Sequence, residues 1–339
     1  MIRRRWTLLT GLLLAFAVIV LGSTLPVALV ALGPGPTFDT LAQVDGRPIV
    51  TVNGLMTYPT SGHLNMTTVS VSDRLTMFEA LGQWAAADSK LVPREQVYPP
   101  GKTDQEVEQE TQQSFATSEL SAEVAALSYL HSPIKVTVGG VGDHSPAVGL
   151  LQPGDQLQAI NGRPIESVNA VYDALRDTRP GQQVVIRIVR GGTPRDVSVT
   201  LGSRPDGPQG FLDVTPTGEL PNPDEIKIGL ADVGGPSAGL IFALAVVDKL
   251  TPGELTGGKF VAGTGEISQT GDVGPIGGIP FKMIAARAAG ATVFLVPAKN
   301  CEEALSNAPD GLQLVKVGTL GEAVSALDAV REGRMPPAC

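Results

Sequence analysis

Hydrophobic residues form one long run near the start of the chain and short periodic stretches after it. The long run covers residues 6–32 and follows Arg3, Arg4 and Arg5. About 20 apolar residues cross a bilayer as a helix, so the run predicts a retained transmembrane anchor. Its most apolar part, residues 12–21, also fits the shorter core of a cleavable signal peptide. The arginines ahead of the run place the N-terminus in the cytoplasm and the rest of the chain outside it.

The stretches after this run alternate between strand and helix periods. Apolar residues at every second position predict strands at residues 48–52, 64–71, 134–138, 184–190, 195–201, 211–214 and 226–230. Apolar residues at helical spacing predict helices at residues 73–87, 117–130, 168–177, 236–250 and 281–289. Residues 92–110 are polar and predict an exposed loop that runs into a helix. The mixture indicates an α+β protein.

Composition narrows the class of protein. The 339 residues are 42% hydrophobic and 17% charged, which predicts a globular chain of about two domains. A net charge of −9 and the lack of a basic patch argue against a nucleic-acid partner. The two cysteines, Cys301 and Cys339, either pair outside the cytoplasm or remain free thiols. The two cysteines and the three histidines, at positions 63, 131 and 144, match no usual spacing of zinc ligands. We therefore expect no metal and no cofactor.

Two glycine-marked helix starts carry the candidate chemistry. Ser237 follows Gly234, Gly235 and Pro236, where free backbone N–H groups can stabilise an oxyanion. Lys282 follows a second glycine-rich turn and lies near the positive end of a predicted helix. That position, with partial burial, is expected to lower the pKa of its ammonium group. A neutral lysine can activate a serine hydroxyl. Taken singly, the first feature is also an ordinary helix start and the second an ordinary solvated lysine.

Together these segments resemble the proteolytic domain of the Lon protease family. The resemblance rests on Gly235-Pro236-Ser237-Ala238-Gly239, Gly263-Thr264-Gly265-Glu266-Ile267, and Gly274-Pro275-Ile276-Gly277-Gly278 followed four residues on by Lys282. It implies a Ser-Lys dyad with Ser237 as nucleophile, Lys282 as general base, Thr264 orienting the lysine, and Gly235, Pro236 and Ala238 supporting the site. Gly234 departs from the family pattern, which has an acidic residue there. No stretch of the chain carries a Walker A motif, so the resemblance covers no ATPase element.

Residues 134–203 resemble a PDZ domain of bacterial envelope proteases. Four motifs occur in order: Ser145-Pro146-Ala147, Gly149-Leu150, Pro153-Gly154-Asp155 and Ile160-Asn161-Gly162-Arg163-Pro164-Ile165. The resemblance implies capture of extended peptides on a sheet edge, and a structural or gating role stays open. Residues 117–130 also resemble a helix N-terminal to the Lon serine motif, so the PDZ domain is expected as an insertion in the protease domain.

The predicted organisation follows from these resemblances. We expect a cytoplasmic tip and anchor at residues 1–33, the N-terminal part of the Lon-like domain at 34–131, the PDZ domain at 132–204, the catalytic part at 205–330 and a tail at 331–339. The predicted function is ATP-independent serine endopeptidase activity on unfolded or exposed polypeptides outside the cytoplasmic membrane. The alternatives are a non-catalytic, membrane-anchored PDZ scaffold and a protease that acts mainly on itself. The expected partners are polypeptide substrates and the membrane, with a homo-oligomer, a hexamer by analogy to the family, and no nucleic acid.

Overall fold

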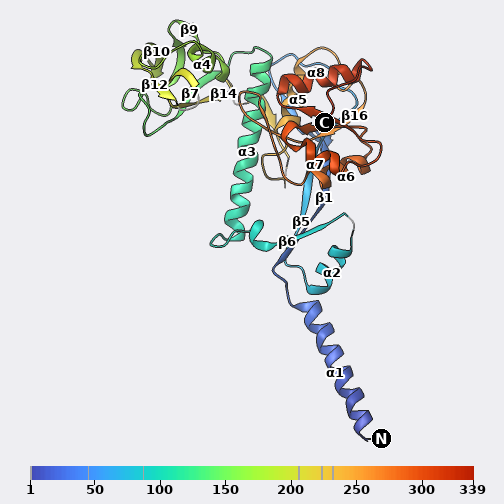
Figure 1. Ribbon diagram of the computed structural model, residues 1–339. Helices are drawn as coiled ribbons and strands as arrows, with labels where there is room; N and C mark the ends of the chain where they lie inside the picture. Colours follow the sequence, from blue (N-terminus) through green and yellow to red (C-terminus); the bar gives the residue numbers. More distant parts are fainter. Residues whose placement is uncertain (1, 45, 87, 205–206, 223, 231–232) are drawn as a thin grey trace.

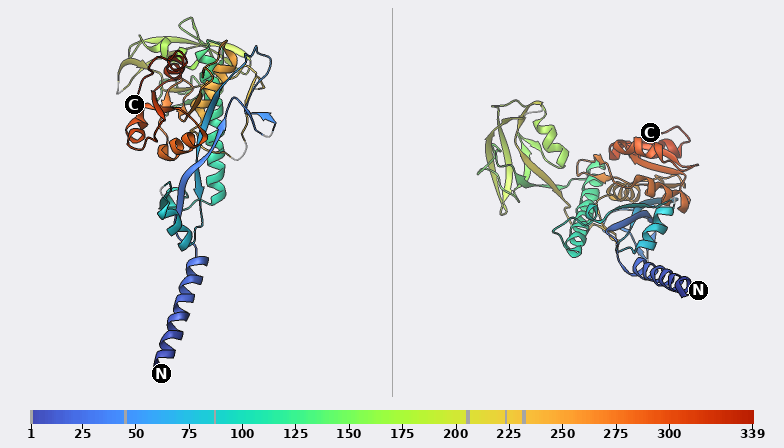
Figure 2. Two further views of the ribbon diagram at one scale, coloured as in Figure 1. Left: turned by 90° about the vertical axis from the view of Figure 1, so that its right-hand side faces the viewer. Right: turned by 60° about the horizontal axis from the view of Figure 1, so that its bottom comes forward.

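Two sheet-containing parts of the molecule lie on either side of a long helix, and the N-terminal helix projects away from both parts (Figure 1). The computed structural model describes residues 2–44, 46–86, 88–204, 207–222, 224–230 and 233–339. The views in Figure 2 show that the projecting N-terminal helix lies apart from both sheets, whereas the C-terminus lies on the larger part.

The larger part is built on a six-stranded sheet that joins two distant segments of the chain. Its strand order is β20–β19–β16–β5–β1–β6. Strands β5, β16, β19 and β20 are parallel to one another, whereas β1 is antiparallel to β5 and β6. The bounds are β1 (Leu29–Asp39), β5 (His63–Ser72), β6 (Lys90–Pro93), β16 (Phe260–Gly263), β19 (Val293–Pro297) and β20 (Gln313–Val317). Segments on either side of residues 132–204 therefore share one sheet.

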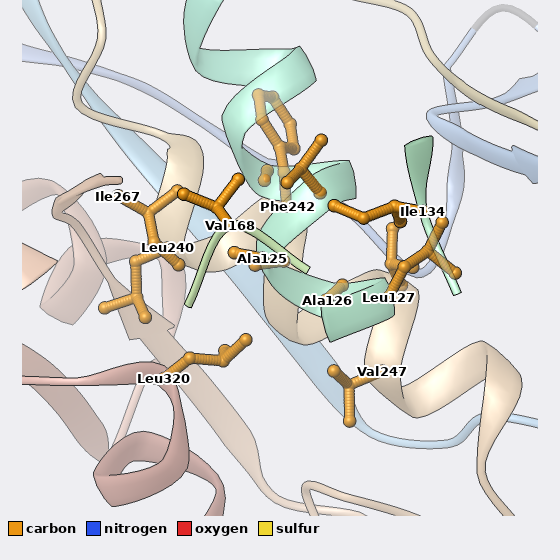
Figure 3. Close-up of a cluster of buried hydrophobic side chains, with 14 of the residues drawn as sticks. Ala125, Ala126, Leu127, Ile134, Val168, Leu240, Phe242, Val247, Ile267 and Leu320 are labelled. Carbon is orange, nitrogen blue, oxygen red and sulfur yellow. The ribbon is translucent and has the colours of Figure 1, made fainter. Parts of the chain in front are cut away.

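The core of this part is a helix that is apolar all round. Helix α5 (Gly239–Leu250) is buried along most of its length, as expected for a helix with apolar residues on every side. The long helix α3 (Asp104–Tyr129) packs against it, and the Phe115 and Phe242 rings meet edge to face with centroids 5.7 Å apart. Figure 3 shows side chains of α3 and α5 meeting Leu320 and Ile267. Further helices are α6 (Ile279–Ala289), α7 (Cys301–Ser306) and α8 (Leu320–Arg331).

The second sheet has the order β11–β10–β8–β7–β14, with β9 paired to β8. Its elements are β7 (Lys135–Val141), β8 (Gln156–Ile160), β9 (Arg163–Pro164), α4 (Val168–Leu175), β10 (Gln183–Arg190), β11 (Thr193–Thr200) and β14 (Val214–Glu219). The edge strand β14 comes from beyond residue 204, so this sheet extends past the predicted domain boundary. The predicted strand at 211–214 is wrong: β13 (Gly207–Phe211) pairs with β12 (Gly202–Arg204), and Asp213, at φ 50°, separates it from β14.

Short ribbons and turns complete the fold. Strand β2 (Gln43–Val44) pairs with β3 (Arg47–Pro48), β4 (Val50–Val52) with β15 (Ile226–Ile228), and β17 (Glu266–Ile267) with β18 (Val273–Gly274). The 3₁₀ turns are η1 (Arg94–Gln96) and η2 (Ala298–Asn300). The β4–β15 ribbon is a second link between the segment before the second sheet and the segment after it.

The N-terminal helix is shorter than predicted. Helix α1 (Ile2–Thr24) ends ahead of Pro26, and the last part of the apolar run enters strand β1 because its residues pair with β5 and β6. Among the residues that the structure describes, no helix combines the length and apolarity that a membrane crossing requires. The predicted transmembrane helix is therefore not supported. Helix α2 (Met77–Ala85) packs beside α1 and begins with a capping box, Thr76 with Glu79.

Candidate active site

Ser237 lies in the turn that precedes α5, not in the helix itself. The predicted helix start at Pro236 is wrong by three residues, since α5 begins at Gly239. The Ser237 carbonyl explains the difference. It accepts hydrogen bonds from the Gly265 N–H at 2.8 Å and from Thr264 Oγ1 at 2.9 Å, whereas the first helical bonds run to the Ala238 carbonyl. The turn is therefore tied to the loop after β16.

Lys282 reaches the serine from a different helix. It is the fourth residue of α6, whose N-cap Gly278 is left-handed and whose second residue is Pro280. The lysine side chain is buried, with 3% of its surface exposed. Its Nζ lies 2.7 Å from Ser237 Oγ and 2.9 Å from Thr264 Oγ1. The structure thus brings together three side chains that are up to 45 positions apart in the sequence.

Burial sets the basicity of Lys282. It lowers the pKa of the ammonium group to about 8, and the negative charge of Glu266 partly opposes this shift. The sequence predicted a lowered pKa from the helix terminus together with partial burial, and desolvation in the folded core is the largest cause of the shift in the structure. At a pH near 8 a large fraction of the lysine is neutral and can accept a proton.

Thr264 fixes the direction of the lysine amine. It is fully buried, and its hydroxyl donates to the Ser237 carbonyl, which leaves its oxygen lone pairs facing Lys282 Nζ. A neutral amine has two N–H donors and one lone pair. When one N–H is held by Thr264 Oγ1, the lone pair can be directed at Ser237 Oγ.

The serine opens onto a cavity of about 420 Å³, which we call the serine cleft. Ser237, Lys282 and the predicted supporting residues Gly235, Pro236 and Ala238 all line it, and strands β1 and β5 form the facing wall. Within the described part of the chain, neither the Ser237 N–H nor the Ala238 N–H has a protein acceptor. Both donors are therefore available to an oxyanion bound beside Ser237 Oγ.

Helix α3 holds the turn in place through contacts that the sequence did not predict. The Gly235 N–H donates to the Thr111 carbonyl at 3.0 Å, and Ser118 Oγ donates to the Pro236 carbonyl at 2.9 Å. Gly235 is in the left-handed region, at φ 84°. A Cβ atom at Gly234 would lie 2.2 Å from Thr111 Cγ2. The acidic residue of the Lon pattern therefore has no room here, and no sequence signal linked residues 111 and 234.

We expect Gly234→Asp to damage the site by steric overlap. The new side chain has to displace Thr111, which should cost about 1–3 kcal/mol of stability, as overpacking typically does, and lower kcat/KM about tenfold by shifting Ser237. Thr111→Ala in the same chain removes the Cγ2 atom and should restore most of the activity. Thermal unfolding and peptide hydrolysis measure both effects. Wild-type behaviour of the single Gly234→Asp variant would contradict this account of the turn.

Comparison with known proteins identifies two domains in the chain. Residues 227–329 match the model of the Lon protease (S16) C-terminal proteolytic domain, and residues 105–201 match the model of the PDZ domain. The chain therefore carries two domains in a mixed α/β fold. One is a Lon-type proteolytic domain, which is a type of serine peptidase, and the other is a PDZ domain.

The similar full-length proteins are much longer than the matched region. The chain is 41% identical over 88 residues to the Lon protease of Clostridioides difficile, covering 26% of this chain and 11% of that protein. It is 37% identical over 101 residues to the Lon protease of Rhizobium meliloti, covering 29% and 12%. Among solved structures, the PDZ domain of the SdrC-like protein from Listeria monocytogenes is 26% identical and covers 24% of this chain and 84% of that chain, with a TM-score of 0.22.

Proposed function

We propose that this protein is a serine endopeptidase in which Ser237 is the nucleophile and Lys282 the general base. The observation that carries the proposal is the 2.7 Å contact between Ser237 Oγ and the Nζ of a buried lysine whose pKa is about 8. A serine hydroxyl is a weak nucleophile until an adjacent base accepts its proton. In this site the base lies within hydrogen-bond distance, and with a pKa of about 8 it is neutral in about a tenth of the molecules at pH 7 and in about half at pH 8.

The residues around the serine support an acyl-transfer reaction in two stages. Neutral Lys282 takes the proton of Ser237 Oγ as that oxygen attacks the carbonyl carbon of the scissile bond. The tetrahedral oxyanion is stabilised by the N–H groups of Ser237 and Ala238. Lys282 then gives its proton to the leaving amine and an acyl-serine forms. A water molecule, deprotonated by Lys282, attacks this ester, and the proton returns to Ser237 Oγ as the second product leaves.

The substrates we propose are unfolded or exposed polypeptides, hydrolysed without ATP. The serine cleft is bordered by strands β1 and β5, through Pro36, Phe38 and Thr68 among others, and an extended chain fits such a wall. No Walker A motif occurs in these 339 residues, so energy for unfolding a stable substrate is not supplied by them.

We propose that the PDZ domain, inserted between the two segments of the protease domain, recruits substrate peptides. A cavity of about 380 Å³ lies between α4 and the turn that leads into β14, with Val171, Leu175 and Phe211 among its lining residues. The edge strand β14 of the second sheet contacts the protease domain: the Gly218 N–H donates a hydrogen bond to Gln269 Oε1 at 2.7 Å. Recruitment in this cavity would bring a peptide near the hairpin that carries Glu266.

We place the activity outside the cytoplasm. Cys301 and Cys339 are paired, with Cα atoms 5.1 Å apart, and the pair holds the C-terminal tail against the larger part of the molecule. Disulfides of this kind persist in oxidising compartments. Attachment to the membrane and assembly into a hexamer stay predictions.

One preparation tests the activity and the compartment together. Protein purified without reductant should hydrolyse an unfolded casein in buffer that contains an ATP-consuming enzyme, and the Ser237→Ala variant should not. A maleimide should find no free thiol at Cys301 or Cys339 in this preparation. Dyad-independent hydrolysis, or no hydrolysis together with retention of peptides by the PDZ domain, would refute the proposed peptidase, and the second result would favour a scaffold.

A further inference from the structure

Glu266 stands between two cavities that flank the candidate nucleophile. It is the first residue of β17 and is exposed to solvent. It lines the serine cleft, and it also lines a second cavity of about 580 Å³ along α3, which we call the α3 groove. The two cavities meet at Pro236, which lines both. A polypeptide bound across Ser237 therefore has Glu266 beside it.

Among the described residues that line the two cavities, Glu266 is the one charged residue that forms neither a salt bridge nor a side-chain hydrogen bond, although its charge acts on Lys282 at longer range. The other charge of the serine cleft is Lys282, which is buried and bonded to Ser237 and Thr264. The other charge of the α3 groove is Glu110, which pairs with Lys102 at 2.6 Å. Within the described ranges, no lysine or arginine forms an ion pair with Glu266, so its carboxylate is available to a ligand.

The α3 groove has the lining that a long basic side chain requires. Pro236 and Ile267 supply apolar surface for the methylene stem, and side chains of α3 supply hydrogen-bonding oxygen atoms. The α3 residues that line the groove, besides Glu110, are Gln113, Ser114, Thr117, Ser118 and Ser121. No basic residue is among the described residues that line it, so a cationic head group meets no like charge there.

We propose that Glu266 selects substrates that carry an arginine or lysine side chain close to the scissile bond. The inference rests on the proposed peptidase function and names a preference of the same site. Arginine suits the groove because its guanidinium can meet a carboxylate with two parallel hydrogen bonds. Glu266 is a specificity residue in this mechanism and takes no part in the bond-breaking steps.

The test compares arginine with citrulline, its uncharged isostere. Fluorogenic peptides carry one or the other at each of three positions on either side of the cleavage site, and kcat/KM is measured at pH 9. At this pH Lys282 is mostly neutral and arginine is still charged, so the ionisation of the base does not confuse the comparison. We expect wild type to prefer arginine at one position or more, by about three- to fivefold, the size of an exposed ion pair.

Two variants and one control isolate the charge of Glu266. Glu266→Gln should lower the arginine-to-citrulline ratio of kcat/KM to about one. The hydrolysis of the citrulline peptides that this variant retains shows that it is folded. Glu266→Arg should reverse the preference. The control Glu302→Gln changes an exposed carboxylate in the first turn of α7 and should retain the wild-type preference.

The outcomes separate the two proposals. Peptide hydrolysis that requires Ser237 but shows the same arginine-to-citrulline ratio in wild type, Glu266→Gln and Glu266→Arg would overturn the role of Glu266 and leave the peptidase intact. Hydrolysis that is absent, or that persists in Ser237→Ala, would overturn the peptidase and this inference with it. Loss of the preference in Glu302→Gln as well would assign it to net charge and not to this position.

Discussion

Lys282→Met should lower kcat/KM for peptide hydrolysis by about a thousandfold, which is the size of a lost general base. Methionine preserves an unbranched apolar stem as far as Cε in the buried site but lacks the terminal nitrogen, so it offers no base to Ser237 Oγ. Ser237→Ala should lower kcat/KM by at least as much. The double variant should be no worse than the more damaged single variant, because the two side chains act as one unit. Steady-state kinetics on a fluorogenic peptide measures all three.

The matched control for this set is Lys299→Met. Lys299 lies in the 3₁₀ turn after β19 and is exposed, so its removal should leave kcat/KM within a factor of about two, as surface substitutions usually do. A Lys282→Met enzyme with near wild-type kcat/KM would show that another group accepts the serine proton. Equal losses in the two lysine variants would show that the assay responds to charge and not to the site.

The second large effect is the dependence of activity on pH. Burial lowers the pKa of Lys282 to about 8, and only the neutral amine can act as the base. The value of kcat/KM should therefore rise about tenfold per pH unit below the midpoint and level off above it, so activity at pH 6 should be about a hundredth of the plateau. A profile measured from pH 5.5 to 9.5 with an uncharged peptide shows this directly. A plateau that begins below pH 6, or a decline between pH 7 and 9, would contradict the assignment.

The burial of Lys282 also predicts how the free energy of unfolding changes with pH. This measurement checks the pKa of Lys282 independently of the activity profile. The pKa of Lys282 is lower in the folded chain than its usual value of 10.5, so between about pH 8 and 10.5 the unfolded chain binds more protons. Stability contributed at this site therefore increases with pH across that window. Below pH 8 the free energy of unfolding of Lys282→Met should be up to about 3 kcal/mol higher than that of wild type. Above pH 10.5 this difference should be smaller. Denaturant titrations at pH 7 and pH 10 compare the two.

The sequence predicted the chemistry of the site better than its surroundings. The glycine-marked turns pointed to Ser237 and Lys282, and the resemblance to the Lon proteolytic domain added Thr264. The structure joins these three residues by hydrogen bonds of 2.7–2.9 Å. The size of the pKa shift on Lys282 depends on burial in the packed core, and no local pattern reports that. The contacts of Thr111 and Ser118 with the serine turn were missed for the same reason, since they join residues more than a hundred positions apart.

Element boundaries failed where periodicity carries no information. Helix α3 begins at Asp104, well before the predicted start at residue 117, because its first half holds only two large apolar residues, Val107 and Phe115, and so lacks a continuous apolar stripe. Thr103 and Glu106 form a capping box, and this sequence pattern indicates a helix that begins at residue 104. At the N-terminus the hydropathy pattern predicts one helix for the whole apolar run, but its last residues enter β1 because apolar residues suit a buried strand as well as a helix. Asp213 interrupts a predicted strand through its left-handed backbone, which hydropathy does not reveal.

Reaction with a serine-directed fluorophosphonate tests the central claim most directly. The reagent bonds to an activated serine oxygen, and peptide mass spectrometry then locates the adduct. The wild-type protein should carry one phosphonyl group on Ser237, formed faster as the pH rises toward 8, and Lys282→Met should carry none in the same time. Labelling of a different serine, or equal labelling of Ser237 in wild type and Lys282→Met, would contradict the dyad.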